Sequence, residues 1–194
     1  LGFFFNIGSE MKTIIAISTI VSLTLINVIG VDISQIFAKL FTGLKLLALG
    51  LIILLGLYFS QSSTLSHTVN FDMSDVPDGI LSMMLLAFIG VFWSFGGWHH
   101  TTYLAGETKD PQKTIPKAML YGTMTVTIVY VLTLLAYSFL LPIDELSSST
   151  RIAGDAVGNV LSGGGKLVTI AVSISIFGTI GIYTMTAPRI YYVM

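Results

Sequence analysis

The stretch Trp93-Ser94-Phe95-Gly96-Gly97-Trp98-His99-His100 lies in the middle of the longest uncharged run of the sequence. The run extends from Gly79 to Gly106, and its 28 residues exceed the roughly 20 that a helix needs to cross a bilayer. Adjacent glycines are poor helix formers, because each costs about 1 kcal/mol relative to alanine. Within lipid, unwound backbone persists only where it is buried in protein or lines a water-filled cavity. The stretch therefore predicts a membrane helix that is interrupted at a binding site.

The glycine pair also has a simpler interpretation. Gly96 and Gly97 could let a neighbouring helix approach closely, as small residues do in membranes. The aromatic residues beside them, Trp93 and Trp98, could belong to an interfacial belt that faces lipid. Trp98 lies near the centre of the uncharged run, however, away from either membrane interface. Its position favours the interrupted helix.

The composition is that of a membrane protein. The chain is 54% hydrophobic and 10% charged, with a mean hydropathy of +0.87, whereas a soluble domain would carry more charge. The net charge of −1 argues against a nucleic-acid partner, which requires a basic surface. Because the sequence has no cysteine, disulfides, thiolate metal sites and cysteine nucleophiles are excluded.

The two ends of the sequence indicate a piece of a larger protein. The sequence begins at Leu1 without an initiator methionine and stops at Met194, directly after two tyrosines and a valine. It shows neither the basic segment nor the small-residue cleavage site of a signal peptide. We expect residues 1–194 to be a fragment of one transmembrane domain in a longer polytopic protein.

Charged residues divide the sequence into five uncharged runs of 19, 26, 28, 26 and 22 residues. Each run predicts one membrane-spanning helix. The predicted helices cover residues 11–30, 36–59, 80–105, 116–141 and 166–191. A further short helix is expected over 152–161, ended by a glycine-rich segment. The predicted fold class is therefore all-α and transmembrane, with the third helix discontinuous.

The orientation of the spans follows from lysine and arginine, which are enriched in short cytoplasmic loops. One side of the predicted membrane holds Lys39, Lys109, Lys113, Lys117 and Arg189, and the other holds only Lys12, Arg151 and Lys166. The loop 106–115 is therefore predicted to be cytoplasmic. The connections 60–79 and 142–165 are predicted to face outward.

Lys45 is a candidate functional residue inside the second predicted span. Counted from Ile36 at about 1.5 Å per residue, its Cα lies roughly 14 Å along the helix. An ionisable group at such a depth costs a few kcal/mol and indicates a functional site. Alternatively the helix enters the bilayer later, near Phe41, and the lysine reaches back to the interface. The spacing leaves both interpretations open.

Two histidines follow the glycine pair. On a helix His99 and His100 would point about 100° apart, so they cannot both bind one ion without a distorted backbone. No HExxH motif or carboxylate cluster accompanies them, and we predict no metal site. His99 either offers a hydrogen bond to the unwound segment or is an ordinary interface histidine.

The glycine-rich segment 163–166 lacks the spacing of a phosphate-binding loop. That motif needs glycine at position 160, where Val160 stands, and Ser or Thr after the lysine, where Leu167 stands. No Gly-x-Ser-x-Gly motif, Ser/His/Asp grouping or pair of acids lies within the predicted spans. The sequence thus predicts neither an enzymatic activity nor a cofactor.

The interrupted stretch also resembles a known family. Phe92-Trp93-Ser94-Phe95-Gly96-Gly97-Trp98, followed by Glu107-Thr108-Lys109-Asp110-Pro111, is similar to the sixth helix and following loop of bacterial amino acid permeases. These belong to the amino acid–polyamine–organocation superfamily, and the closest likeness is to its L-type amino acid transporter branch. Segments 26–31, 41–49 and 187–194 resemble the ends or interiors of helices four, five and eight, in the same order.

The resemblance implies a fold of two inverted repeats of five helices, in which helices one and six are broken at the substrate. This chain would contain helices four to eight. Backbone carbonyls near Ser94 and Phe95 would face the substrate α-amino group, while helix one would meet the carboxylate. Trp93 would form an aromatic lid. The implied substrate-binding set is Trp93, Ser94, Phe95, Gly96, Gly97, Trp98 and His99.

The resemblance also assigns a role to Lys45. It matches a helix-five lysine that, in sodium-independent members, stands in for the sodium ion of sodium-coupled relatives. Thr179 would approach it from helix eight. His99 stands where the animal branch often has Asn, and Gly106 stands where many members have an acid, so the resemblance does not indicate the substrate side chain.

The expected function is a sodium-independent amino acid permease that works by alternating access, as a uniporter, exchanger or proton-coupled carrier. We expect a multi-pass protein of the cell (plasma) membrane whose partners are its amino acid substrate and the lipid bilayer. A partner subunit is left open. The alternatives are a polyamine or organic-cation carrier, which would need acidic groups in its cavity, and a membrane sensor or scaffold that binds without transport.

Overall fold

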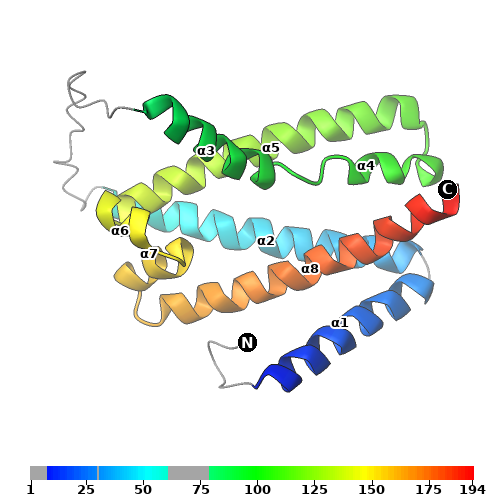
Figure 1. Cartoon of the computed structure of the whole chain (residues 1–194), viewed down its shortest axis with the longest axis horizontal. Coiled ribbons are helices and arrows are strands. Elements are labelled where there is room, and N and C mark those ends of the chain that lie inside the picture. Colours follow the sequence, from blue (N-terminus) through cyan, green and yellow to red (C-terminus); the bar gives the residue numbers. More distant parts are fainter. Residues whose placement is uncertain (1–7, 30, 61–78) are drawn as a thin grey trace.

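The computed structural model describes residues 8–29, 31–60 and 79–194, and the elements in these ranges are all helices (Figure 1). In chain order they are α1 (Ser9–Ile29), α2 (Val31–Phe59), α3 (Ile80–Ser94), α4 (His100–Tyr103), the 3₁₀ helix η2 (Ala105–Glu107), α5 (Pro111–Leu140), α6 (Ile143–Ser148), α7 (Ile152–Val160) and α8 (Gly164–Val193). The prediction of an all-α membrane protein is confirmed.

Four helices in the described ranges are long and apolar enough to cross a membrane. They contain the segments Ser9–Val28, Ser34–Phe59, Pro111–Leu140 and Gly164–Tyr191. The third predicted span, 80–105, is not one continuous helix, because α3 has 15 residues and ends well before α4 begins. The structure therefore replaces the third of the five predicted helices by two shorter ones joined by a turn.

Two helices, α5 and α8, begin earlier than predicted, because a proline or glycine sets the position of the first turn. The prediction began the fourth span at 116, but Pro111 holds the first turn of α5, where its fixed φ and missing N–H are tolerated. The connection before α5, predicted over 106–115 and predicted to be cytoplasmic, is accordingly shorter. Gly163, with a φ of 79°, precedes the first residue of α8. Of the predicted outer loop 60–79, residues 61–78 lie outside the described ranges.

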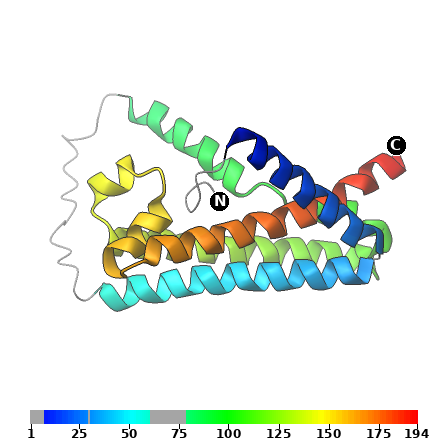
Figure 2. The same ribbon diagram turned by 90° about the horizontal axis from the view of Figure 1, so that it is seen from below.

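The centre of the bundle consists of α2, α5 and α8. Figure 2 shows these three helices running side by side, with α1 slanting across α8. Glycines permit the close approach, because a Cβ built on Gly56 would lie 2.5 Å from the Cβ of Ala136 in α5. A Cβ on Gly178 would likewise lie 2.5 Å from the Cβ of Phe41. The sequence thus lets α2 contact both of its neighbours through glycine.

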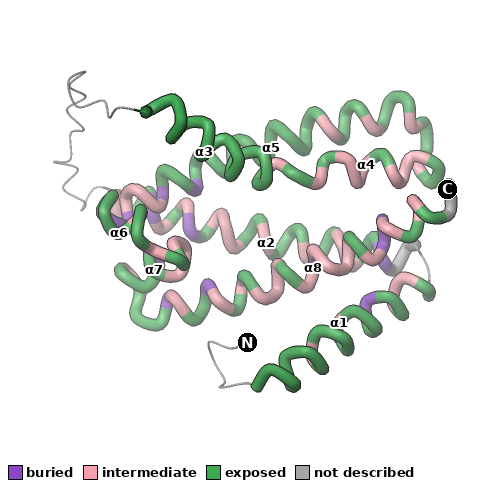
Figure 3. Tube along the Cα trace, in the orientation of Figure 1, coloured by how far each residue is buried: buried purple, intermediate pink, exposed green. Residues whose placement is uncertain are grey.

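Most of the described buried residues gather at the end of the bundle covered by α6 and α7, while Leu23, Ser34, Met185 and Thr186 lie toward the other end (Figure 3). One cluster joins Ile52 of α2 and Ala136 of α5 to Val157 of α7 and Val168 of α8. By contrast α3 has no buried residue, and Figure 2 shows it slanting away from α2, α5 and α8. The opposite half of the bundle is therefore less tightly packed, and this is the half that contains the turn between α3 and α4.

Candidate functional site

The turn between α3 and α4 begins where the hydrogen-bond pattern of α3 changes. Phe95 still donates its N–H to Val91 O at 3.0 Å, but Gly96 donates to Trp93 O at 3.1 Å, which is the tighter pattern of a 3₁₀ turn. Gly97 then takes a φ of 104°, a left-handed conformation that glycine adopts without steric cost. The second glycine is thus the residue that turns the backbone away from the axis of α3.

The turn leaves backbone polar groups without partners. No described residue donates a hydrogen bond of normal geometry to the carbonyl oxygen of Phe95 or Gly96. The carbonyl of Ser94 is different, because it accepts a hydrogen bond from the hydroxyl of Tyr130 at 2.9 Å. Unpaired carbonyls at membrane depth are tolerated where they line a polar cavity or bind a ligand.

A cavity of about 440 Å³ lies beside this turn. It is bordered by α2, α4, α5, α8 and the turn itself, and its lining includes Lys45, Tyr130, Thr179 and every residue from Ser94 to Trp98. The predicted lysine and the predicted helix interruption therefore face the same space. Among the described residues that line the cavity there is no aspartate or glutamate.

Lys45 and Thr179 contact each other at one wall of this cavity. The Nζ atom of Lys45 donates to Thr179 Oγ1 at 3.3 Å, and both residues are half-buried. The threonine hydroxyl donates its own proton to Ser175 O at 3.0 Å, which leaves an oxygen lone pair for the ammonium. No carboxylate of a described residue forms an ion pair with Lys45. The ammonium therefore remains an uncompensated positive charge beside the turn.

His100, rather than His99, lines the cavity. Its Nδ1 atom lies 2.9 Å from Thr186 Oγ1, and the same hydroxyl lies 3.0 Å from Ile182 O. A carbonyl cannot donate, so both contacts are hydrogen bonds only if Thr186 donates to Ile182 and accepts from a protonated Nδ1. In the neutral ring Nε2 is then an acceptor, and it is buried without a partner among the described residues.

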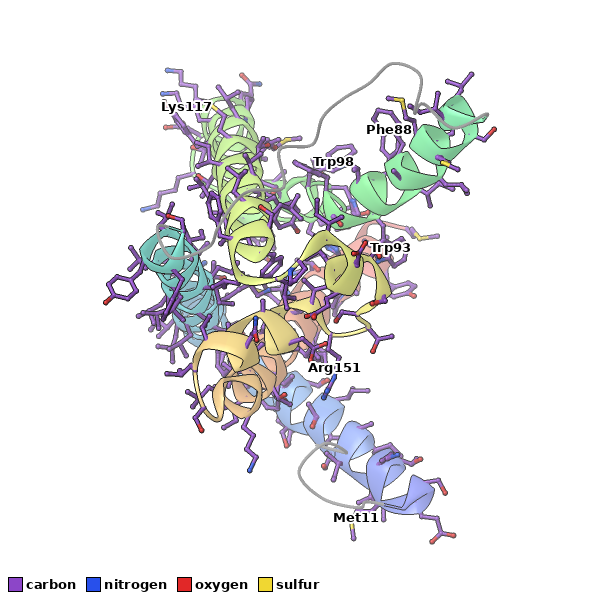
Figure 4. All side chains as sticks on the ribbon, turned by 90° about the vertical axis from the view of Figure 1, so that its left-hand side faces the viewer. Met11, Phe88, Trp93, Trp98, Lys117 and Arg151 are labelled. Carbon is purple, nitrogen blue, oxygen red and sulfur yellow. The ribbon has the colours of Figure 1, made fainter. Side chains whose placement is uncertain are left out.

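Two residues of the predicted binding set lie outside the cavity lining. His99 does not line it, because neighbouring residues of a helical turn face different directions and His100 takes the inward one. Trp93, the predicted lid, is 88% exposed at the end of α3. Figure 4 labels Trp93 and Trp98, of which only Trp98 belongs to the lining. The remaining predicted members, Ser94, Phe95, Gly96 and Gly97, all line the cavity.

Besides His100, the sequence analysis missed Tyr130 of the cavity lining and Thr186, which contacts His100. Each is one of several hydroxyl residues in a long apolar helix. Most hydroxyl side chains in such helices hydrogen-bond to the backbone of their own helix. A tyrosine in mid-span whose hydroxyl needs a partner was the available signal for Tyr130. Thr186 carried no comparable signal, because its importance arises only from its contact with His100.

A second polar region lies below the cavity, toward the predicted cytoplasmic side. Here a cavity of about 350 Å³ shares His100 and Gly97 with the first and is lined by the hydroxyl residues Thr101, Thr108, Thr114 and Thr186. Next to it Arg189 of α8 pairs with Glu107 of η2, with Nε and Oε1 3.1 Å apart. Arg189 also donates through Nη1 to the carbonyl of Met185. This ion pair holds the segment after α4 against α8.

Comparison with known proteins shows the family of the chain. The amino acid permease family matches the chain over residues 1–194. The serine/threonine exchanger SteT of Bacillus subtilis is 29% identical over 98% of this chain and 42% of its own length. The human b(0,+)-type amino acid transporter 1 is 27% identical over 97% of this chain and 39% of its own length. The mouse Asc-type amino acid transporter 1 is 30% identical over 91% of this chain and 34% of its own length.

These proteins are transporters, so the prediction that the chain is not an enzyme is confirmed. The chain spans about two fifths of the length of the curated relatives it matches. Its apolar helices mark it as a multi-pass membrane protein. The chain belongs to the amino acid permease family.

Proposed function

We propose that this chain contributes helices four to eight of a sodium-independent amino acid permease of the plasma membrane, with the turn between α3 and α4 as part of the substrate site. The observation that carries the proposal is that Lys45 and the open carbonyls of Phe95 and Gly96 border one cavity. The names of the relatives, which include an exchanger and several amino acid transporters, support the same class of cargo.

The carbonyl oxygens of Phe95 and Gly96 can bind the α-ammonium group of an amino acid. An α-ammonium group has three N–H donors and a positive charge, and carbonyl oxygens with no other donor are acceptors for it. A free carbonyl in a low-dielectric setting binds a cation more strongly than it would in water, because water does not compete. We therefore assign substrate α-amino recognition to Phe95 and Gly96. The inverted-repeat arrangement and the aromatic lid proposed for Trp93 remain parts of the same hypothesis.

The ammonium group of Lys45 can replace a bound coupling cation. Its ammonium lies at a helix-to-helix contact between α2 and α8 and is held by the oxygen of Thr179. A fixed positive charge there would provide the electrostatic contribution of a bound ion, but without dependence on an ion gradient. Transport should therefore not require sodium. The proposal includes uniport, exchange and proton coupling.

The composition of the cavity argues against a polyamine carrier. A di- or tri-cation would need carboxylates near its charges, yet the described lining residues include none and do include the cation Lys45. The second alternative, a sensor or scaffold without transport, would show ligand binding but no flux. One relative is named as the small subunit of a large neutral amino acid transporter, and we leave a partner subunit for this protein open.

The test is uptake of labelled L-amino acids by the full-length protein, purified and reconstituted alone into liposomes. We expect saturable uptake in buffer without sodium, competition by unlabelled amino acids and no competition by spermidine. Binding of an amino acid in detergent with no uptake into liposomes would favour the sensor. Uptake that appears only with a sodium gradient would refute the role of Lys45.

A further inference from the structure

We propose that Asn27 is a positioning residue, which supplies to α8 the hydrogen bond that Pro188 removes and thereby holds Thr186 of that helix against His100. Asn27 lies near the end of α1 and does not line the cavity, so it acts on the site through α8. The structural argument stands without the proposed function. The inference rests on the proposed function only where transport is measured.

The hydrogen-bond pattern of α8 has a gap at its proline. Pro188 lies inside α8, which continues to Val193. In an α-helix the carbonyl of each interior residue accepts from the N–H four residues later. For Thr184 that residue is Pro188, whose ring has no N–H and crowds the carbonyl four residues before it. The carbonyl of Thr184 therefore lacks the donor that a regular helix would give it.

The side-chain amide of Asn27 provides a donor for this carbonyl. Its Nδ2 atom donates to Thr184 O at 3.0 Å, in a partly buried contact. On the other side of the amide, Oδ1 accepts from the hydroxyl of Ser34, a buried residue of α2, at 3.3 Å. The two bonds use the amide in one orientation, because only its nitrogen donates and only its oxygen accepts. One asparagine thus joins α1 to both α2 and α8.

An ordinary interhelical contact is the simpler interpretation, since asparagine side chains often hydrogen-bond across membrane helices. The partner atom distinguishes the two. Membrane helices tolerate proline where neighbouring helices satisfy the backbone groups that the proline frees. Asn27 bonds to the carbonyl whose regular donor is missing because of Pro188. The geometry therefore predicts that the contribution of Asn27 depends on the proline.

The same turn of α8 contacts the wall of the cavity. Thr186, two residues after Thr184, is 1% exposed, and its hydroxyl lies 2.9 Å from Nδ1 of His100, which lines the cavity. A helix bends most easily at a proline, and a bend changes the direction of the side chains near it. Asn27 holds the Thr184 carbonyl and limits that bending, which keeps Thr186 within reach of His100.

A double-mutant cycle between Asn27→Leu and Pro188→Ala tests the dependence on the proline. Leucine has the branched shape of asparagine without its amide, and alanine at position 188 gives the Thr184 carbonyl a backbone N–H again. We measure Tm for the full-length protein in detergent. Asn27→Leu should lower Tm by about 2–4 °C when Pro188 is present, and by less than about half as much beside Pro188→Ala.

The matched control for the cycle is Asn159→Leu. Asn159 also donates through Nδ2 to a backbone carbonyl, that of Leu140, and the distance is again 3.0 Å. Because this contact lies far from Pro188 in the fold, its loss should lower Tm equally in both backgrounds. If Asn27→Leu likewise lowered Tm equally in both backgrounds, the amide would not replace the missing donor and the inference would be overturned.

The ring of His100 gives a readout that a general loss of stability does not move. In the structure its Nδ1 atom carries the proton that the hydroxyl of Thr186 accepts. Nitrogen NMR of histidine-labelled full-length protein reports which ring nitrogen is protonated, and the His100 signal is assigned by its absence from His100→Gln. We expect the Nδ1-protonated form to fall at least about twofold in Asn27→Leu, and to return when Pro188→Ala is added. An unchanged His100 signal in Asn27→Leu would overturn the inference.

Transport supplies the third readout. We expect Asn27→Leu to lower kcat/KM about three- to tenfold, mainly through KM because His100 lines the cavity, and to lower it less than about twofold beside Pro188→Ala. Asn159→Leu should transport like the wild type, and equal transport by Asn27→Leu would contradict the positioning role. Failure of the wild type to transport any amino acid would instead refute the proposed function, while the Tm cycle and the His100 signal would still decide the role of Asn27.

Discussion

The Nζ atom of Lys45 lies 3.3 Å from Oγ1 of Thr179, across the contact between α2 and α8. A lysine that reached back to the membrane interface would point along its helix toward solvent, but this one points sideways into the bundle. Its partner is a hydroxyl oxygen and not a carboxylate, so the positive charge is held without being neutralised. The sequence leaves two interpretations open for Lys45, and this contact favours the functional lysine within the span over the lysine that reaches back to the interface.

Thr179→Val should weaken transport, because it preserves the shape of the side chain but removes the oxygen that holds the ammonium. We expect kcat/KM to fall about three- to tenfold, the equivalent of one hydrogen bond to a charged group. The control is Thr169→Val, since that hydroxyl bonds only to Gly165 O in its own helix. Equal activity of the two variants in liposome uptake would show that the Lys45 contact is dispensable.

Gly97→Ala should distort the turn through its backbone and not through a clash. A Cβ on Gly97 would meet only His100 Cδ2 at 3.8 Å, an ordinary contact, but the φ of 104° is unfavourable for any residue with a Cβ. The strain should cost about 1–2 kcal/mol and lower the affinity of the site. The comparison is Gly90→Ala within α3, where a Cβ meets nothing within 4 Å. If Gly97→Ala binds and transports like Gly90→Ala, the left-handed turn is not required.

Gly56→Ala should destabilise the bundle without touching the site. Its Cβ would lie 2.5 Å from that of Ala136, so α2 and α5 would have to move apart. We expect a loss of about 1–3 kcal/mol in the free energy of unfolding, visible as a lower Tm in detergent. Gly50→Ala on the same helix, with nothing within 4 Å, should leave Tm unchanged or raise it slightly. The reverse order of the two Tm values would contradict the packing of α2 on α5.

The pair of Glu107 and Arg189 should contribute only a small coupling energy. Arg189 is 18% exposed, but Glu107 is 42% exposed, and solvent screens a pair of that kind. A double-mutant cycle with Glu107→Gln and Arg189→Gln should give about 0.5–1 kcal/mol at low salt and less at high salt. Thermal unfolding at two ionic strengths measures it. A coupling above about 2 kcal/mol, or one insensitive to salt, would show that the pair is far better shielded than its exposure indicates.

The sequence predicts those parts of the site that depend on charge spacing and on helix propensity. Charge spacing locates the spans, and the low helix propensity of Gly96 and Gly97 locates the turn. The placement of Lys45 opposite Thr179 follows from the family resemblance, because residues so far apart in sequence meet only through the packing of whole helices. Spacing alone leaves that lysine undecided between two positions.

The sequence did not allow us to predict which side chains point into the cavity. Which histidine points inward depends on the rotation of α4 about its axis, and this rotation is set by the left-handed conformation of Gly97 and by the contact with Thr186. For the same reason Trp93 was assigned to the site although it is exposed. Tyr130 was missed because its partner is a backbone carbonyl of another helix, which leaves no pattern in the sequence.

The most direct test of the central claim is uptake of labelled amino acids by Lys45→Met, measured in sodium-free liposomes beside the wild type and Lys117→Met. Methionine has about the length of lysine but no charge, and Lys117 is an exposed lysine outside the cavity lining. If the ammonium of Lys45 replaces a coupling cation, the wild type and Lys117→Met transport at similar rates and Lys45→Met loses at least about tenfold in kcat/KM. Uptake by Lys45→Met at the wild-type rate would contradict the account.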